Sequence, residues 1–347
     1  NALDHTHRSA LFSRIYPTPE SDNMPVALSR HPWHACLGGR MIAWLVRLSL
    51  SVVVTAWVVS TLVFFLLHLV PGDPVAVMLG DWASAADEAA LRRQLGLDQP
   101  ITHQYLTFLT GLLQGDLGQS LFYQTPVADL VAERFPYTLQ LAFMAMLIAV
   151  LIAFPLGLWA ALRAGDWPDY VSMSVSMLGV SVPNFWLGPM LILVFALGLG
   201  WFPVSGAEQG FAWVLPAVTL GTALAAILAR MLRASMLEVM HEDFVRTAQA
   251  KGLRRFQVIG RHALANALLP VVTLLGLQLG TLLGGAVITE VVFDWPGMGQ
   301  LLVESIQRRD YPVVQACILV ISVAYISING LTEVMYAWLD PRIRVGT

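Results

Sequence analysis

Six apolar segments, each long enough to cross a lipid bilayer, constrain the fold of this chain more than any other feature. A helix rises 1.5 Å per residue, so about 20 apolar residues span the roughly 30 Å of hydrocarbon in a membrane. The segments cover residues 48–70, 138–162, 170–199, 212–236, 268–293 and 313–339. Pro183 lies inside the third and is expected to kink or break its helix. The sequence therefore predicts an all-α membrane protein with six transmembrane helices.

The composition agrees with this prediction. Hydrophobic residues make up 56% of the chain and charged residues 12%, whereas soluble domains carry roughly 25% charge. The net charge of −3 argues against a nucleic-acid binder, which requires a basic patch. Cys36 and Cys317 lie far apart in contexts of opposite polarity, so they indicate neither a disulfide framework nor a metal cluster.

The distribution of Lys and Arg predicts the orientation. If the N-terminus is cytoplasmic, the cytoplasmic segments contain every Lys and Arg except Arg92, Arg93, Arg134, Arg308 and Arg309. Cytoplasmic loops near span ends are enriched in these residues, and an even number of spans places both termini on one side. Both termini are therefore predicted to be cytoplasmic.

The chain divides into four regions. Residues 1–40 are polar and without periodicity, and are expected to be a disordered extension or a start-site artefact ahead of Met41. Residues 41–70 form the first transmembrane helix. Residues 71–136 form an extracytoplasmic loop with expected helices near 84–95 and 105–113, and residues 137–344 form the core, with a charged cytoplasmic loop at 237–266.

That cytoplasmic loop carries the most specific motif. It reads VRTAQAKGL over residues 245–253 and HALANALLP over residues 262–270. Further landmarks are PGDP at 71–74, GLD at 96–98, GDLG at 115–118, SVPNFW at 181–186, WPGMG at 295–299, RDYP at 309–312 and DPRIR at 340–344. Together they resemble the permeases of ABC transporters, in the branch that contains the dipeptide, oligopeptide and nickel importers. Arg246 stands where the general permease motif has glutamate, and the spacing to Pro270 is longer, as is usual in that branch.

The resemblance implies a type I ABC importer permease fold in a bacterial inner membrane, with a helical extracytoplasmic loop and a cytoplasmic coupling helix. It also implies several partners: a second homologous permease subunit, two cytoplasmic ATPase subunits and an extracytoplasmic substrate-binding protein. The chain itself is expected to bind no cofactor and to catalyse no covalent step, with ATP and Mg held by the ATPases. Di- or oligopeptides are the first expected cargo, and glutathione or a nickel chelate remain open.

The residues independently argue against ATP hydrolysis by this chain. A phosphate-binding loop needs a glycine-rich turn that ends in Lys-Ser or Lys-Thr. The only lysine, Lys251, is followed by Gly252. The ATPase must therefore be a separate subunit.

The cytoplasmic loop has the properties of a coupling element. An acidic residue at a helix start complements the helix dipole, small alanines keep the helix slim enough to enter a groove on an ATPase, and Gly252 permits a sharp reversal. The basic residues match an acidic rim on a partner. The candidate coupling residues are Asp243, Arg246, Thr247, Ala248, Ala250, Lys251, Gly252, Arg254 and Arg255. The alternative is a solvated basic loop that only sets topology.

The fifth span contains glycines at intervals of four, Gly276, Gly280 and Gly284. Such a face favours close helix packing over a substrate groove. Gln278 and Thr281 beside it are polar enough to line a pathway or to lock helices together, and Pro183 belongs to the same set of packing or pathway candidates. Glu290, Glu333 and Asp340 lie near span ends, where water is expected to reach them.

The segment between the fifth and sixth spans is a candidate outer gate. Leu301, Leu302, Val303 and Ile306 have helical spacing, which predicts a short amphipathic helix that helps to close the outer mouth. The candidate gate or binding-protein docking residues are Trp295, Gly297, Arg308, Arg309 and Asp310. A plain interfacial helix is the alternative.

The sequence fits two other function classes less well. An intramembrane protease needs its catalytic groups within the bilayer, but Gly118-Gln119-Ser120 lies in the outer loop and only His68 among the histidines falls within a span. An ion-coupled secondary transporter would place ionisable residues near the membrane midplane. Transport that depends on a separate ATPase would discriminate between the three classes.

Overall fold

A computed structural model describes residues 33–69, 75, 85–94 and 96–339. The chain divides into two units, residues 1–46 and 47–347. Only the beginning of one helix is described in the first unit, so the following description concerns the second. The expected extension up to residue 32, and the landmarks at 71–74 and 340–344, lie outside the described residues.

The regular elements of this part of the chain are all helices, as predicted. They are α2 (Trp33–Leu69), α4 (Ala85–Gln94), α5 (Ile101–Leu113), α6 (Val127–Leu162), α7 (Trp167–Ser181), α8 (Asn184–Leu191), the π-helix η1 (Ile192–Gly198), α9 (Val214–Met240), α10 (Asp243–Ala250), α11 (Arg255–Gln257), the π-helix η2 (Val258–Ala263), α12 (Leu264–Gly285), α13 (Val287–Val292), α14 (Met298–Gln307) and α15 (Tyr311–Leu339).

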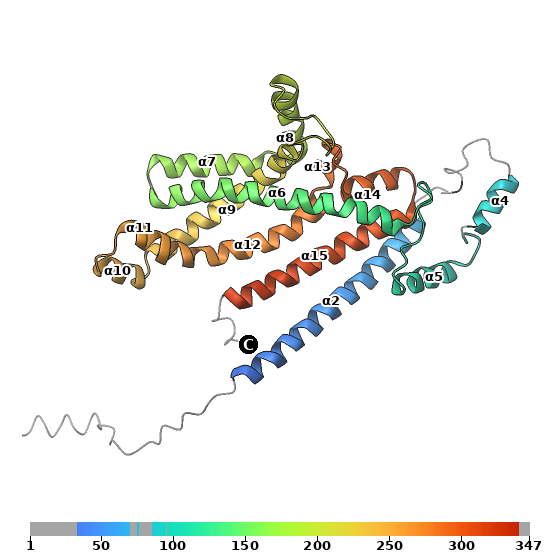
Figure 1. Cartoon of the computed structure of the whole chain (residues 1–347), viewed down its shortest axis with the longest axis horizontal. Coiled ribbons are helices and arrows are strands. Elements are labelled where there is room, and N and C mark those ends of the chain that lie inside the picture. The colour runs from blue at the N-terminus through green and yellow to red at the C-terminus, as the bar shows by residue number, and fades with distance from the viewer. Residues whose placement is uncertain (1–32, 70–74, 76–84, 95, 340–347) are drawn as a thin grey trace, which may run out of the picture. The chain divides into compact units, whose positions relative to one another are not determined.

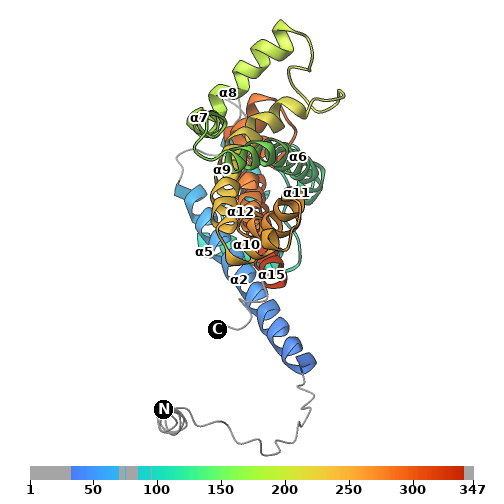
Figure 2. The same cartoon turned by 90° about the vertical axis from the view of Figure 1, so that its left-hand side faces the viewer.

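Five helical runs within the described ranges are long and apolar enough to cross a membrane, and a bent pair makes a sixth if it is one span. The pair is α7 with α8 and η1, which meet at an angle of 100°. The expected break at Pro183 is confirmed, because Pro183 precedes α8 and Val182 before it is extended. Figures 1 and 2 both show α8 standing out from the helices α6, α7 and α9.

Several boundaries differ from those expected. α2 already begins at Trp33, and α6 begins at Val127, so the end of the expected outer loop is helix. The fifth span was expected to continue to Phe293, but α12 ends at Gly285 and α13 is a separate helix. Two consecutive glycines, the weakest helix formers after proline, account for that interruption. Helices α4 and α5 occupy the two stretches where loop helices were expected.

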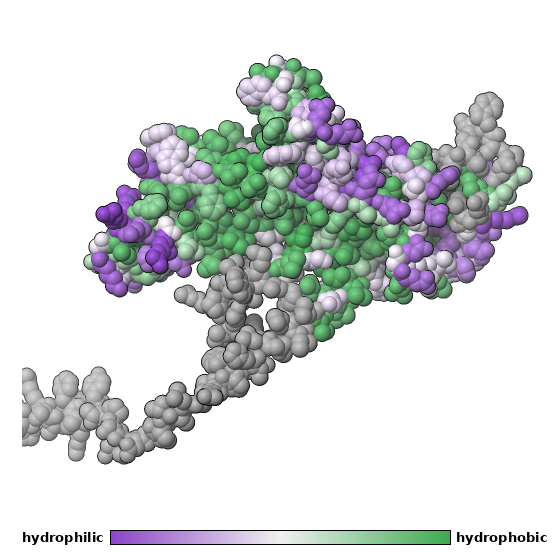
Figure 3. Space-filling view, viewed as in Figure 1, coloured by the Kyte–Doolittle hydropathy of each residue, from purple (hydrophilic) through white to green (hydrophobic). Residues whose placement is uncertain are grey.

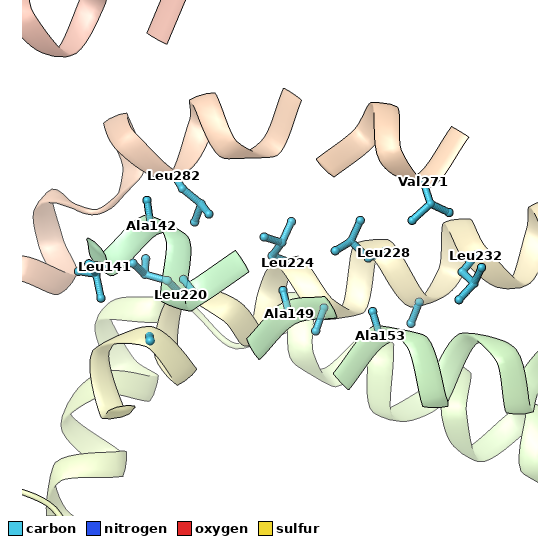
Figure 4. Packing of buried hydrophobic residues seen from close by; sticks show 14 of the residues in the cluster. Leu141, Ala142, Ala149, Ala153, Leu220, Leu224, Leu228, Leu232, Val271 and Leu282 are labelled. Atoms are coloured by element: carbon cyan, nitrogen blue, oxygen red, sulfur yellow. The ribbon is translucent and has the colours of Figure 1, made fainter. Parts of the chain in front are cut away.

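The core lies where α9 packs between α6 and α12 (Figure 4). Leu220, Leu224, Leu228 and Leu232 form one stripe of α9, and alanines line the facing side of α6. The backbones approach closely: a Cβ added to Gly221 would lie 2.7 Å from the carbonyl oxygen of Ala145. Small residues make such contacts possible where burial from lipid supplies little driving force.

An ion pair between the partly exposed Arg233 and the buried Asp169 links α9 to α7 beside this core. The Arg233 guanidinium donates through Nε and Nη2 to the two carboxylate oxygens of Asp169, whose side chain is 5% exposed. The backbone N–H of Gly165 donates to the same carboxylate over 3.0 Å. The pair therefore also holds the turn between α6 and α7.

Hydrophobic residues cover the sides of α6, α7 and α12, and polar residues gather at the two ends of these helices (Figure 3). One end carries α10 and α11, and the other carries α14 (Figure 1). The predicted coupling residues and the predicted gate residues therefore lie at opposite ends of the membrane-spanning helices.

Candidate functional site

The predicted coupling loop consists of two helical pieces joined by a tight reversal. α10 is followed by Gly252 in the left-handed conformation, with φ +79°. The N–H of Gly252 donates to the carbonyl of Gln249 over 2.9 Å, and the N–H of Leu253 donates to that of Ala248 over 3.4 Å. A glycine in this conformation commonly ends a helix. The reversal expected at Gly252 is therefore present, and its coupling role stays a prediction.

Ala248 is buried within this chain. Its side chain is 6% exposed and packs with Val245 and Val258 against Val239 and Met240. The expectation that Ala248 enters a groove on another subunit is wrong. The reason is the helical period, which turns Val245 and Ala248 together toward the rest of the chain. Asp243, Arg246, Thr247, Ala250, Lys251, Arg254 and Arg255 are exposed and remain candidates for the contact.

Three exposed apolar residues in the same loop were missed by sequence reasoning. Phe244, Leu253 and Phe256 are exposed, and Phe256 is 85% exposed. Aromatic groups surrounded by charge on a surface are typical of protein interfaces. Their signal in the sequence is that apolar residues occur in this charged loop away from the buried positions Val245 and Ala248 of α10.

The three glycines on one face of α12 lie in different environments. A Cβ on Gly276 would overlap Thr332, and one on Gly280 would lie 2.8 Å from Oδ1 of Asn329. These two glycines therefore pack α12 against α15, as predicted. Gly284 has no atom within 4 Å of an added Cβ, so it does not pack within the described residues.

The polar pair beside this face is bonded to itself. The Thr281 hydroxyl donates to the Gln278 carbonyl over 2.8 Å and lies 3.2 Å from Oε1 of Gln278. It therefore does not lock α12 to another helix in these bonds. The pathway role of Gln278 and Thr281 stays a prediction.

The predicted helix of the outer segment is α14, and a buried carboxylate holds its first turn. Glu290 is fully buried and accepts hydrogen bonds from the Thr138 hydroxyl (2.7 Å) and from the N–H groups of Gly299 (2.6 Å) and Gln300 (3.2 Å). The expectation that water reaches Glu290 is wrong, because α13 places this side chain beneath α14. The side chain of Glu333 and all of Asp340 lie outside the described residues.

Trp295 and Gly297 complete this junction. Trp295 is 2% exposed, and its Nε1 donates to the carbonyl of Tyr137 over 3.0 Å. A Cβ at Gly297 would overlap the Glu290 carboxylate. Neither residue offers a docking surface, so their docking role is excluded, and only a role in shaping the outer gate remains.

Asp310, which follows α14, is also fully buried. It accepts a hydrogen bond from the Ser120 hydroxyl. It also accepts one from the N–H group of Leu121 and one from that of Phe122, each with a donor–acceptor distance of 3.1 Å. The expectation that Asp310 meets a binding protein is therefore wrong. Ser120, which stands in the Gly118-Gln119-Ser120 sequence, belongs to a structural turn.

Further side chains join the end of α14 to the turn that contains Ser120, Phe122 and Tyr123. The guanidinium carbon of Arg308 lies 3.9 Å from the ring centre of Phe122, within cation–π distance. The Tyr123 hydroxyl donates to Glu304 over 3.0 Å. Burial and this carboxylate raise the pKa of Tyr123, so the phenol stays a donor. Arg308 and Arg309 are partly exposed and remain docking candidates.

Comparison with known proteins identifies the family. Residues 153–345 match the family described as binding-protein-dependent transport system inner membrane component, and residues 41–142 match the N-terminal region of such components. The chain belongs to this family. It is 45% identical over 304 residues to the glutathione transport system permease protein GsiC of Escherichia coli strain K12, covering 88% of this chain and 99% of GsiC. The GsiC protein of Shigella dysenteriae gives the same values.

A solved structure supports the fold. A chain of the inward-facing MetNI methionine ABC transporter aligns with a TM-score of 0.50 and 20% identity, covering 61% of this chain and 96% of that chain. The binding-protein-dependent permease described here is a multi-pass inner-membrane subunit of an ABC importer. It is a transport subunit, and ATP hydrolysis belongs to separate ATPase subunits. The protease and the ion-coupled transporter are thereby excluded.

Proposed function

We propose that this permease imports glutathione or a closely related short peptide. The observation that carries the proposal is the 45% identity to GsiC along nearly the whole of both chains. The same branch was expected from the sequence to carry di- or oligopeptides. A tripeptide such as glutathione belongs to that chemical class, whereas a nickel chelate does not.

The working assembly contains this chain, a second homologous permease, two cytoplasmic ATPase subunits and an extracytoplasmic binding protein. ATP and Mg are held by the ATPases. The surface for the ATPase is the exposed side of α10 and α11. There Phe244, Leu253 and Phe256 supply apolar contact, and Lys251, Arg254 and Arg255 meet an acidic rim.

Coupling follows from the continuity of the helices beyond this surface. Arg255–Gly285 is one apolar helical run through α11, η2 and α12. A displacement imposed at α10 and α11 is therefore transmitted along α12 toward the outer end. ATP biases the equilibrium between inward- and outward-open states because the ATPases contact this loop differently in each state. Both termini of the permease lie in the cytoplasm.

Uptake of radiolabelled glutathione tests the substrate. The permease is expressed with its partner subunits in cells without another glutathione importer, and unlabelled dipeptide and nickel chelate are added as competitors. Saturable uptake, abolished when the phosphate-binding lysine of the ATPase is replaced, is expected. Uptake of the dipeptide or the chelate without glutathione would refute the substrate, and uptake that survives loss of the ATPase would refute the mechanism.

A further inference from the structure

The helix α14 is attached at both of its ends to one continuous stretch of chain. At its start, Glu290 holds the N–H groups of Gly299 and Gln300 together with the hydroxyl of Thr138 on α6. The Thr138 oxygen in turn accepts a bond from the N–H of Met298 over 2.8 Å. Thr138 therefore serves as a donor to α13 and as an acceptor for α14.

After the end of α14, Asp310 holds the turn that precedes α6. The turn is itself closed, since the N–H of Ser120 donates to Thr125 over 2.9 Å and the N–H of Val127 donates to Gly118 over 3.0 Å. The same Ser120 hydroxyl that donates to Asp310 accepts a bond from the N–H of Tyr123 over 2.8 Å. Asp310 is thus bonded to a turn that its own hydrogen bonds already close.

Apolar packing fills the space between the two carboxylates. Val127 and Val131 of α6 form one buried cluster with Met298 and Leu301 of α14. Val313, Ala316 and Cys317 of α15 complete the cluster. α14 is therefore bound along its length as well as at its ends.

Breaking the hydrogen bonds at either attachment point costs free energy, because the groups that form them are buried. The donors to both carboxylates are neutral hydroxyl and backbone N–H groups. A buried carboxyl group is tolerated only while such bonds are intact, because separating the partners leaves several buried polar atoms without hydrogen bonds. Each junction therefore resists opening more strongly than an apolar contact of the same size.

We propose that Glu290 and Asp310 are positioning residues that clamp α14 to residues 118–138, so that α14 moves with the start of α6 as one rigid body. The outer mouth then does not open by a hinged swing of α14. It opens when this whole body is displaced during the transport cycle. This inference rests on the proposed function for its role in transport, but the clamp itself can be measured without it.

A distance measurement tests the rigid body directly. Spin labels are placed at Thr125 and Gln307, which are both exposed, in a variant without Cys36 and Cys317. The transporter is reconstituted with its partner subunits and measured without nucleotide and after trapping with ATP and vanadate. We expect one narrow distance that is the same in both states. A distance that shifts between the states by several ångströms would overturn the proposal.

Variants of the carboxylates test the cause. Asp310→Asn places an NH2 group against a backbone N–H donor in either orientation, because Oδ1 and Oδ2 each accept from one. Glu290→Gln can keep its oxygen on the two N–H groups, but its NH2 group then faces the Thr138 hydroxyl, which loses its acceptor. In both variants the Thr125–Gln307 distance should become broad even without nucleotide. Thr138→Val removes the hydroxyl with little change of shape and should act in the same direction. Asp294→Asn is the matched control, because Asp294 is an exposed carboxylate of the same segment. Asparagine keeps an Oδ1 that can accept the bond from the Gln300 amide, and the left-handed φ of +49° suits it. A narrow distance in all the clamp variants would overturn the proposal.

A coupling ratio distinguishes positioning from simple damage. In folded Thr138→Val and Glu290→Gln transporters we expect about tenfold less substrate imported per ATP hydrolysed, because the gate no longer follows the helices that drive it. Equal losses of uptake and hydrolysis would indicate a structural role only and would overturn the positioning role. Absent uptake in the wild type, with the narrow distance retained, would refute the proposed function but leave the clamp.

Discussion

At the residue scale, burial decides the role of side chains that look alike in sequence. Ala248 and Ala250 lie two residues apart in α10, but Ala248 is buried against Val258 and Ala250 is exposed. Asp310 and Arg309 are neighbours, yet Asp310 holds the Ser120 turn and Arg309 is partly exposed. Residues that carry the motif are therefore divided between the internal structure and the surface offered to partners.

The conformation of Gly252 gives one prediction. Gly252→Ala should cost about 1–2 kcal/mol because a side chain disfavours the left-handed region, while an added Cβ meets no atom within 4 Å. Uptake should fall and ATPase association should weaken, with the protein still inserted in the membrane. Gly260→Ala is the control, since its added Cβ also meets nothing within 4 Å and Gly260 is not among the positive-φ glycines. Equal uptake in both variants would contradict the role of the reversal.

The opposite faces of the coupling loop give a second prediction. Ala248→Trp overfills the cluster with Val245 and Val258 and should destabilise the permease by roughly 1–3 kcal/mol. Phe256→Ala removes an exposed ring and should leave stability unchanged while ATPase co-purification falls. Thermal unfolding in detergent and pull-down of the ATPase measure the two effects. An Ala248→Trp permease of wild-type stability would show that this cluster is not packed as described.

At the scale of the elements, small residues and one ion pair set the helix contacts. Gly276 and Gly280 bring α12 against α15, and Gly221 brings α9 against α6. The bend between α7 and α8 follows from Pro183, whose ring removes a backbone donor. The fixed helices then carry the coupling loop at one end and α14 at the other.

Two glycines of α12 provide a comparison within one helix. Gly276→Ala places a methyl group into Thr332 and should lower stability by roughly 1–3 kcal/mol. Gly284→Ala enters open space and should leave the unfolding temperature of the isolated chain unchanged. If Gly284→Ala nevertheless lowers uptake, this position contacts the second permease or the cargo. Similar unfolding temperatures for both variants would contradict the packing of α12 on α15.

The pair between α7 and α9 gives a fourth prediction. Arg233→Met leaves the buried Asp169 carboxylate without the partly exposed cation that two hydrogen bonds attach to it, which is destabilising. The unfolding temperature and the yield of the purified permease should fall. Arg230→Met, three residues earlier and exposed, should change neither. A silent Arg233→Met would mean that solvent already screens this pair.

At the scale of the whole molecule, topology connects the two ends to their partners. An importer must present its coupling loop to ATPases in the cytoplasm and its gate to a binding protein outside. The distribution of Lys and Arg favours this orientation. With both termini in the cytoplasm, as we propose, the number of crossings is even, and the bent pair of α7 with α8 and η1 then counts as one of them.

Thiol labelling tests this orientation. Single cysteines at Gln99 and Gln257, which are both exposed, are introduced into a variant without Cys36 and Cys317. An impermeant reagent added to intact cells should label position 99 only, and position 257 should react after the membrane is opened. Labelling of both positions from outside would contradict the six-span topology.

The sequence by itself determined the helices, the membrane environment, the family resemblance and the reversal at Gly252. These depend on local properties: the length of apolar runs, the spacing of small residues and the conformational freedom of glycine. Only the tertiary structure decided that Glu290 and Asp310 are buried, that Ala248 faces inward and that Gly284 is open while Gly276 is packed. These outcomes depend on which distant segment lies opposite each residue. Thr138 reaches Glu290 and Ser120 reaches Asp310 only because α6 and the turn before it pack on α14, and that pairing is not encoded in any local pattern.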